Sequence, residues 1–271
     1  MLTNLSRMLT YLTALLYAIL GAILFILPEQ ISPVFAWKVS PFVTMTIGGW
    51  CLGNAWLAFW AARRWRWDLV YSPLCYLGLF AVLETSIAFL FREKLQLGHP
   101  IAWLYLATLG VNLLMTLLAL VEYPRVQPSL APDGPPVSGL LRGLNLVFIV
   151  FAAFLGYYGL TAKIGDFGTN GGIFPELLSL FTLRSFGAFY FSLALGVLPL
   201  LWAKSARSYL SHGFLSSGFL LFITLAAFAY LRVFNFQAHP SQMIYIGTYL
   251  VVGGVIAILL LKYGTGLQKN Q

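Results

Sequence analysis

Eight apolar stretches, each about as long as a membrane is thick, dominate this chain. The hydrocarbon core of a bilayer is crossed by roughly 20 residues of helix, and 60% of the residues here are hydrophobic while only 9% are charged. The alternating polarity of a transmembrane barrel is absent. We therefore predict an all-α polytopic membrane protein with eight transmembrane helices, at approximately 11–27, 42–62, 69–91, 101–121, 143–162, 183–203, 213–234 and 243–263.

The second half of the chain repeats parts of the first at an offset of 140 residues. The matching pairs are Gly78 and Gly218, Arg92 and Arg232, His99 and His239, Pro100 and Pro240, Tyr105 and Tyr245, and Thr108 and Thr248. A fixed period of this kind indicates an internal duplication. Each half holds four predicted spans, an even number, so the two four-helix repeats are expected to be parallel, related by an axis near the membrane normal.

A proline-rich segment separates the two halves. Between residues 122 and 141 the chain has five prolines and two glycines. Each proline fixes φ and removes a backbone donor, so this segment is predicted to be a non-helical, semi-extended linker. We divide the chain into a first four-helix repeat (1–125), a cytoplasmic linker (126–141) and a second four-helix repeat (142–271).

Positive charge is distributed unequally between the two ends of the predicted helices. The end that carries both termini has ten Lys and Arg residues, and the opposite end has six. Basic residues are enriched in cytoplasmic loops, which predicts cytoplasmic termini in a plasma or cytoplasmic membrane. Clusters such as Arg63, Arg64 and Arg66 lie at helix ends beside tryptophans, as orientation in a bilayer requires. The net charge of +8 therefore indicates the lipid bilayer as partner and not a nucleic acid.

Smaller features predict surface structure and no metal site. The segment between Pro28 and Pro41 is expected to be a short, broken interfacial segment at the outer surface. The glycine-rich residues 165–172 lack the Gly-Lys-Ser/Thr of a phosphate loop and are expected to form an outward-facing turn. Cys51 and Cys75 belong to no C-x-x-C or Cys/His ligand cluster, so we interpret them as packing residues.

Both halves share an order of features that resembles a known family. Each runs as a helix, a Pro-Glu pair, a helix with small residues near its outer end, and two more helices. The Pro-Glu pairs are Pro28-Glu29 and Pro175-Glu176, and the small residues are Gly48, Gly49, Gly53, Gly187 and Ala188. In this order of features the chain resembles two tandem copies of a four-helix membrane protein of the DoxX-like superfamily. The pattern includes Arg184 in the second half, where the first half has Thr44.

That resemblance has limited functional content. It implies a four-helix bundle in each half and, for some members, a link to quinone-connected redox systems. It also makes Arg184 a candidate ligand-binding residue.

Glu84 is the strongest candidate for chemistry within the predicted spans. It lies about 10 Å from the outer end of its helix at 1.5 Å per residue, a depth where ionisable side chains usually face a bundle interior or a cavity. Asn54 and Asn112 fall near the middle of the neighbouring spans. The positions at offset 140 carry no such groups: they are Thr224, Ala194 and Val252.

Two interpretations of these polar residues stay open. In the first, Glu84, Asn54 and Asn112 enclose a polar pocket in the first half, with Glu84 as proton carrier or ligand acceptor and the second half as scaffold. In the second, they form interhelical hydrogen bonds, which contribute about 0.6 to 2 kcal/mol each.

His99 and His239 are candidates at the predicted outer surface. Each precedes a proline that opens a helix, where a side chain can cap free backbone N–H groups. Histidine also permits proton, metal or haem chemistry. Neither has a second ligand three or four residues further on, which favours capping or interfacial anchoring.

No catalytic motif of a serine hydrolase or a zinc protease occurs in the chain. Aromatic residues make up 16% of it, which suits contacts with ring systems and also the filling of membrane cores. The leading hypothesis is a non-catalytic membrane component that binds a hydrophobic cofactor, such as a quinone or pigment, or docks with other membrane subunits. The alternatives are a membrane enzyme acting on a lipid, quinone or isoprenoid through Glu84, and a small-molecule transporter. The sequence does not identify the cofactor.

Overall fold

The fold is known from a computed structural model that describes residues 2–126, 134–163 and 172–263. In these residues eight helices are long and apolar enough to cross a membrane. They are α1 (Asn4–Ile26), α3 (Pro41–Arg64), α4 (Trp67–Leu90), α5 (Pro100–Val126), α6 (Gly139–Leu160), α7 (Leu180–Val197, continued by the 3-10 helix η3, Leu198–Trp202), α8 (Ala206–Ala229) and α9 (Gln242–Tyr263). The predicted all-α fold and the eight predicted spans are confirmed.

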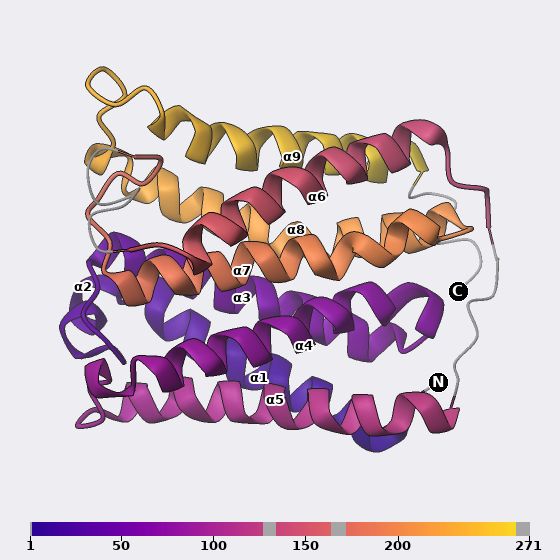
Figure 1. Ribbon diagram of the computed structural model, residues 1–271, viewed down its shortest axis with the longest axis horizontal. Coiled ribbons are helices and arrows are strands. Elements are labelled where there is room, and N and C mark those ends of the chain that lie inside the picture. Colours follow the sequence, from indigo (N-terminus) through magenta and orange to yellow (C-terminus); the bar gives the residue numbers. More distant parts are fainter. Residues whose placement is uncertain (1, 127–133, 164–171, 264–271) are drawn as a thin grey trace.

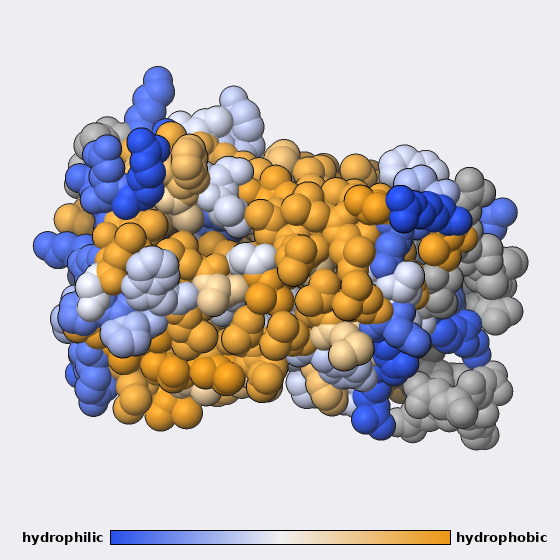
Figure 2. All heavy atoms as spheres, turned by 90° about the horizontal axis from the view of Figure 1, so that it is seen from below, coloured by the Kyte–Doolittle hydropathy of each residue, from blue (hydrophilic) through white to orange (hydrophobic). Residues whose placement is uncertain are grey.

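The eight long helices lie side by side along the long axis of the molecule (Figure 1). Helix α1 begins and α9 ends at the same end, which we call the terminal end (right in Figure 1). The short helices α2 (Pro28–Ile31), η1 (Ser32–Val34), η2 (Arg92–Lys94) and η4 (Leu231–Val233) connect the long helices at the far end. Figure 2 shows a broad hydrophobic belt with hydrophilic residues gathered at both ends. The chain is thus an integral membrane protein, and the side that its terminal end faces stays a prediction.

Local sequence explains where many of the helices begin. Thr3, Ser40, Ser138, Ser179 and Ser205 each precede a helix, and each hydroxyl accepts a hydrogen bond from a backbone N–H of the first turn. Such caps pair donors that the helix itself leaves free.

Helix α5 extends further than the proline pattern predicts. The expectation that the chain is non-helical from residue 122 was wrong, since α5 continues through Pro124 to Val126. Pro124 lies in the last turn, where its missing N–H affects a single helical bond. In the same turn Glu122 accepts hydrogen bonds from Thr3 N (2.9 Å), the Thr3 hydroxyl and the Ser6 hydroxyl (2.8 Å). These bonds hold the start of α1 against the end of α5.

Residues 2–126 share one core with the described residues of the second half, 134–163 and 172–263. Helix α3 packs on α8, and α4 packs on α7. A Cβ at Gly53 would lie 2.2 Å from the Phe219 ring, so α3 and α8 approach as closely as only glycine allows. Beside this contact, the rings of Trp50 and Phe189 stack with centroids 4.5 Å apart and an interplanar angle of 5°.

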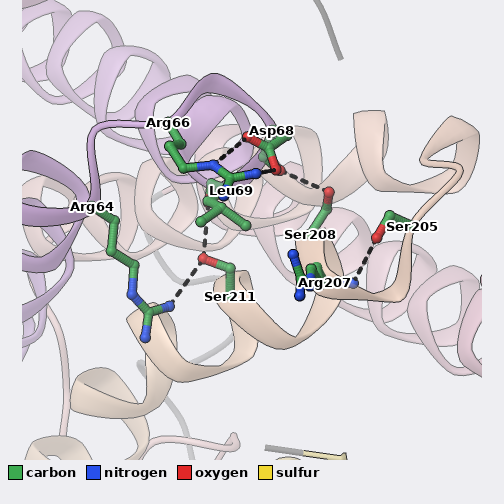
Figure 3. A network of polar contacts seen from close by, with 8 residues as sticks. All are labelled: Arg64, Arg66, Asp68, Leu69, Ser205, Arg207, Ser208 and Ser211. Atoms are coloured by element: carbon green, nitrogen blue, oxygen red, sulfur yellow. Dashed lines mark hydrogen bonds and ion pairs between the residues drawn. The ribbon is translucent and has the colours of Figure 1, made fainter. Parts of the chain in front are cut away.

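Near the terminal end, α4 and α8 are joined by polar contacts (Figure 3). Pro73 lies inside α4 and has no N–H for the Leu69 carbonyl one turn earlier. The Ser211 hydroxyl of α8 donates to that carbonyl instead, at 3.0 Å. One turn away, the Ser208 hydroxyl donates to the Asp68 carbonyl at 2.7 Å. A backbone oxygen left unpaired by a proline is thus satisfied from a neighbouring helix, as apolar surroundings require.

Candidate functional site

Glu84 is buried in the interior of the first half. Only 3% of its surface is exposed, and the Tyr105 hydroxyl of α5 donates to its Oε1 at 2.7 Å. Its Oε2 atom has no hydrogen-bond partner among the described residues. The carboxyl therefore faces the bundle interior, as its depth predicts, and keeps one oxygen free.

A small enclosed space lies beside Glu84. Its volume is about 20 Å³, and its walls include Asn54, Tyr17 and Trp50. Both side-chain polar atoms of Asn54 are buried without a partner in the described part of the chain, as is Trp50 Nε1. A space of this size holds about one water molecule. The site can therefore bind a water or a proton, and a lipid cannot enter it.

Asn112 lies one contact away from this space. Its Nδ2 donates to the Tyr17 hydroxyl at 3.1 Å and to the Leu77 carbonyl at 3.3 Å. Through Tyr17, which lines the space, Asn112 joins α5 to α1. Glu84, Asn54 and Asn112 are thus brought into one interior. The geometry contains interhelical hydrogen bonds as well as free polar atoms, so both interpretations of these residues stay predictions.

The remaining sequence candidates lie elsewhere. His99 and His239 are exposed and lie just before the first residues of α5 and α9, at the far end. Arg184, at the start of α7, lies over the Phe91 ring with Cζ 5.5 Å from its centroid and donates to the Ala162 carbonyl at 3.5 Å. None of these three lines the space beside Glu84.

A much larger cavity, of about 540 Å³, lies in the second half between α6, α7, α8 and α9. Its walls are almost entirely apolar, and Val147 of α6 and Val251 of α9 line it while being largely exposed on the outside of the bundle. Helices α1 and α5 pack together, whereas α6 and α9 barely meet. The cavity therefore opens sideways between α6 and α9, where lipid would surround the protein.

Polar groups gather in two parts of this cavity. Asn145 of α6 and Tyr209 and His212 of α8 line it within the first two turns of their helices, near the terminal end. About the middle of the bundle, the hydroxyls of Tyr190 and Tyr249 are 2.7 Å apart and mark the border with an adjoining pocket of about 90 Å³. The cavity is therefore mainly apolar, with one group of polar side chains near the terminal end and a second, Tyr190, Thr248 and Tyr249, further from it.

His212 connects the cavity with the interface between α4 and α8. It is 7% exposed, and its Nδ1 is 2.9 Å from the Ser72 hydroxyl of α4. Ser72 also donates to the Gly196 carbonyl of α7 at 2.7 Å. That carbonyl is available because Pro199, three residues later in η3, has no N–H to give to it.

The sequence analysis missed both the cavity and His212. The offset of 140 pairs His99 with His239, whereas the position that matches His212 is Ser72, another polar residue within an apolar span. A search for polar residues at matched positions, whatever their type, would have found this pair. The cavity has no sequence signal, because it depends on a gap between two helices.

Comparisons with known proteins add no further identification: no family model, curated protein or solved structure matches the chain. In the described residues, no group of three His, Cys, Asp or Glu side chains lies close enough together to hold a metal ion.

Proposed function

We propose that this membrane protein binds a hydrophobic molecule in the cavity between α6, α7, α8 and α9. The observation that carries the proposal is the volume of about 540 Å³ enclosed by almost wholly apolar walls. Binding sites for small molecules commonly measure 300 to 1,000 Å³ and combine apolar walls with a few polar groups. The opening between α6 and α9 lets such a molecule enter from the bilayer.

The volumes of the two interiors favour the second half as the place of binding. The space beside Glu84 measures about 20 Å³, which excludes a quinone, pigment or isoprenoid in this conformation. An enzyme that acts on a lipid through Glu84 would need this interior to open. Transport and docking against other membrane subunits stay predictions, as does the resemblance to the DoxX-like superfamily.

We also infer that the two halves are parallel repeats that meet at a pseudo-two-fold axis. Support comes from contacts between positions 140 residues apart, which such an axis brings face to face. Ser208 bonds to Asp68, and His212 bonds to Ser72. The pairing of α3 with α8 and of α4 with α7 has the same symmetry.

The binding proposal is tested by identifying molecules that copurify with the full chain in a mild detergent. Val252→Trp places a large side chain into the cavity, and Leu114→Trp adds the same side chain to the exposed surface of α5 as a matched control. We expect solvent extraction and mass spectrometry to find a neutral hydrophobic molecule enriched over the surrounding membrane. It should be lost in Val252→Trp and kept in Leu114→Trp. Equal amounts of ordinary phospholipid in all three proteins would refute the proposal.

A further inference from the structure

The tautomer of His212 follows from its contacts. The Ser72 hydroxyl has one proton, and the Gly196 carbonyl at 2.7 Å can only accept it. The 2.9 Å contact between Ser72 Oγ and His212 Nδ1 is therefore a bond in which Nδ1–H donates. In a neutral imidazole the other nitrogen, Nε2, then carries no proton and is an acceptor.

That acceptor faces the cavity. The His212 ring lines it, and its Nδ1 edge is turned to Ser72 of α4. Nε2 is not among the fully enclosed polar atoms without a partner, as expected for an atom at the cavity wall. His212 is the seventh residue of α8, so it lies roughly 9 Å along the helix.

The cavity's chemistry restricts what can meet this acceptor. None of the described residues that line it is charged. Arg142, whose charge acts on Tyr209, is not on the cavity wall, and its guanidinium donates to the Ala203 carbonyl. An ionic headgroup such as a phosphate would therefore meet no counter-charge on the wall, which is costly in apolar surroundings. Plain acyl chains would fill the apolar part and leave Nε2 unpaired. A neutral lipid with one hydroxyl group satisfies both parts of the cavity.

We propose that the cavity selects a lipid alcohol, an isoprenoid or ring lipid with a terminal hydroxyl, and that His212 Nε2 accepts the hydrogen bond from that hydroxyl. This inference rests on the proposed function, since it needs the cavity to be the binding site. Ser72 is a positioning residue, because its contact with Nδ1 keeps Nε2 free to accept. The apolar tail extends along α6 and α9 towards Tyr190 and Tyr249.

The test compares geranylgeraniol with its methyl ether, which keeps the tail and loses the donor. Both compete with a diazirine-bearing geranylgeraniol for photolabelling of the full chain in nanodiscs, read by mass spectrometry of the α6 and α9 peptides. We expect the alcohol to compete about 3- to 10-fold better than the ether, the value of one hydrogen bond. His212→Phe should abolish that preference, so that alcohol and ether compete equally. His212→Gln, which can present an acceptor, should restore part of it.

Val252→Trp should abolish labelling by the probe, and its failure to do so would refute the cavity as the site and with it the proposed function. If Val252→Trp abolishes labelling while alcohol and ether compete equally in the natural protein, the cavity stands and the role of His212 is refuted. This comparison needs no histidine variant, so it holds even if His212→Phe does not fold. Ser72→Ala should reduce the preference for the alcohol over the ether.

Discussion

The first half of this protein is closed by polar contacts, and the second half is open where those contacts have no equivalent. A Cβ at Gly21 of α1 would lie 3.0 Å from the Cβ of Cys51, and one at Gly156 of α6 would lie 2.6 Å from that of Phe191. Cys51 and Phe191 are 140 residues apart, and Gly21 and Gly156 are 135 apart. If the two halves are repeats, as we propose, these contacts align α1 with α6 at an offset of 135 residues.

With this correspondence, the bond that joins α1 to α5 can be followed into the second half. Tyr17 and Asn112 form that bond, and their counterparts are Ala152 and Val252, which both line the large cavity. The polar contact between Tyr17 and Asn112 is thus replaced by residues that cannot reproduce it.

Close packing and hydrogen bonds between helices close a helix bundle in lipid. Lipid tails are as apolar as the side chains, so helices associate through close packing and hydrogen bonds and not through the hydrophobic effect. A tyrosine and an asparagine bring α1 and α5 together, whereas an alanine and a valine leave a gap. Such a gap must be filled by lipid or by a ligand, and this is the physical basis of the proposed site.

The largest effect is expected from a variant that opens the first half. The double variant Tyr17→Ala with Asn112→Val copies the second half and deletes a side chain that is only 2% exposed. Replacing a large buried aromatic residue by alanine costs about 3 to 5 kcal/mol. We expect a clearly lower unfolding temperature in detergent by intrinsic fluorescence, with Tyr157→Ala, an exposed tyrosine of α6, as the unaffected control. An unchanged unfolding temperature would show that this bond does not close the first half.

The next test concerns Glu84 and its counterpart. Glu84→Leu removes the acceptor of the buried Tyr105 hydroxyl, which should lower the free energy of unfolding by about 1 to 3 kcal/mol. The second half already has a buried tyrosine hydroxyl without an acceptor. Tyr245 has no hydrogen-bond partner in the described residues, and the residue at offset 140 from Glu84 is Thr224. Glu84→Gln keeps an acceptor for Tyr105 and should be milder.

The two Glu84 variants also separate structure from chemistry. If Glu84 carries a proton, Glu84→Gln loses activity at normal expression, because the titratable group is gone. Equal thermal stability of the natural protein and Glu84→Leu would exclude a structural role for the bond to Tyr105.

A smaller effect on stability is expected when the second half is closed. The double variant Ala152→Tyr with Val252→Asn introduces the bond of the first half, which should contribute about 0.6 to 2 kcal/mol and fill the cavity. Binding of a hydrophobic probe should weaken by about tenfold or more, equivalent to about 1.4 kcal/mol. Undiminished probe binding by a folded variant would show that Ala152 and Val252 do not decide whether the cavity is open.

The smallest effect is expected at the far end, at Tyr230 of the second half. Tyr230 follows α8 and donates to Glu29 Oε1 at 2.8 Å, and its counterpart in the first half is Leu90. Burial, together with the bond to Glu29 and its negative charge, raises the pKa of Tyr230 to about 12. Because the folded state favours the neutral phenol, this contribution to stability is present below the usual tyrosine pKa of about 10 and is lost as pH rises through 12.

Tyr230→Phe removes this titration. The unfolding temperature of the natural protein should fall more steeply between pH 10 and 12 than that of the variant. Near pH 7 the free energies of unfolding of the two proteins should agree within about 1 kcal/mol. Parallel curves throughout would exclude the contact with Glu29 as a link between the halves.

The sequence by itself determined the class of fold and much of the placement of its polar residues. Spans can be predicted from composition because lipid imposes one local requirement on every residue of a span, and the depth of Glu84 predicts that it faces the interior. Partners are not local properties: that Glu84 bonds to Tyr105, and Asn112 to Tyr17, depends on how helices rotate against each other.

Only the tertiary structure decided where the molecule is hollow and which histidine faces that space. Ala152 of α6 and Val252 of α9, 100 residues apart in the chain, both line the cavity, and neither has a polar group like those of Tyr17 and Asn112, which bond α1 to α5. His212 acquires its tautomer from a serine on one helix and a carbonyl on another. Both features arise from the packing of several helices, which no single segment of the sequence specifies.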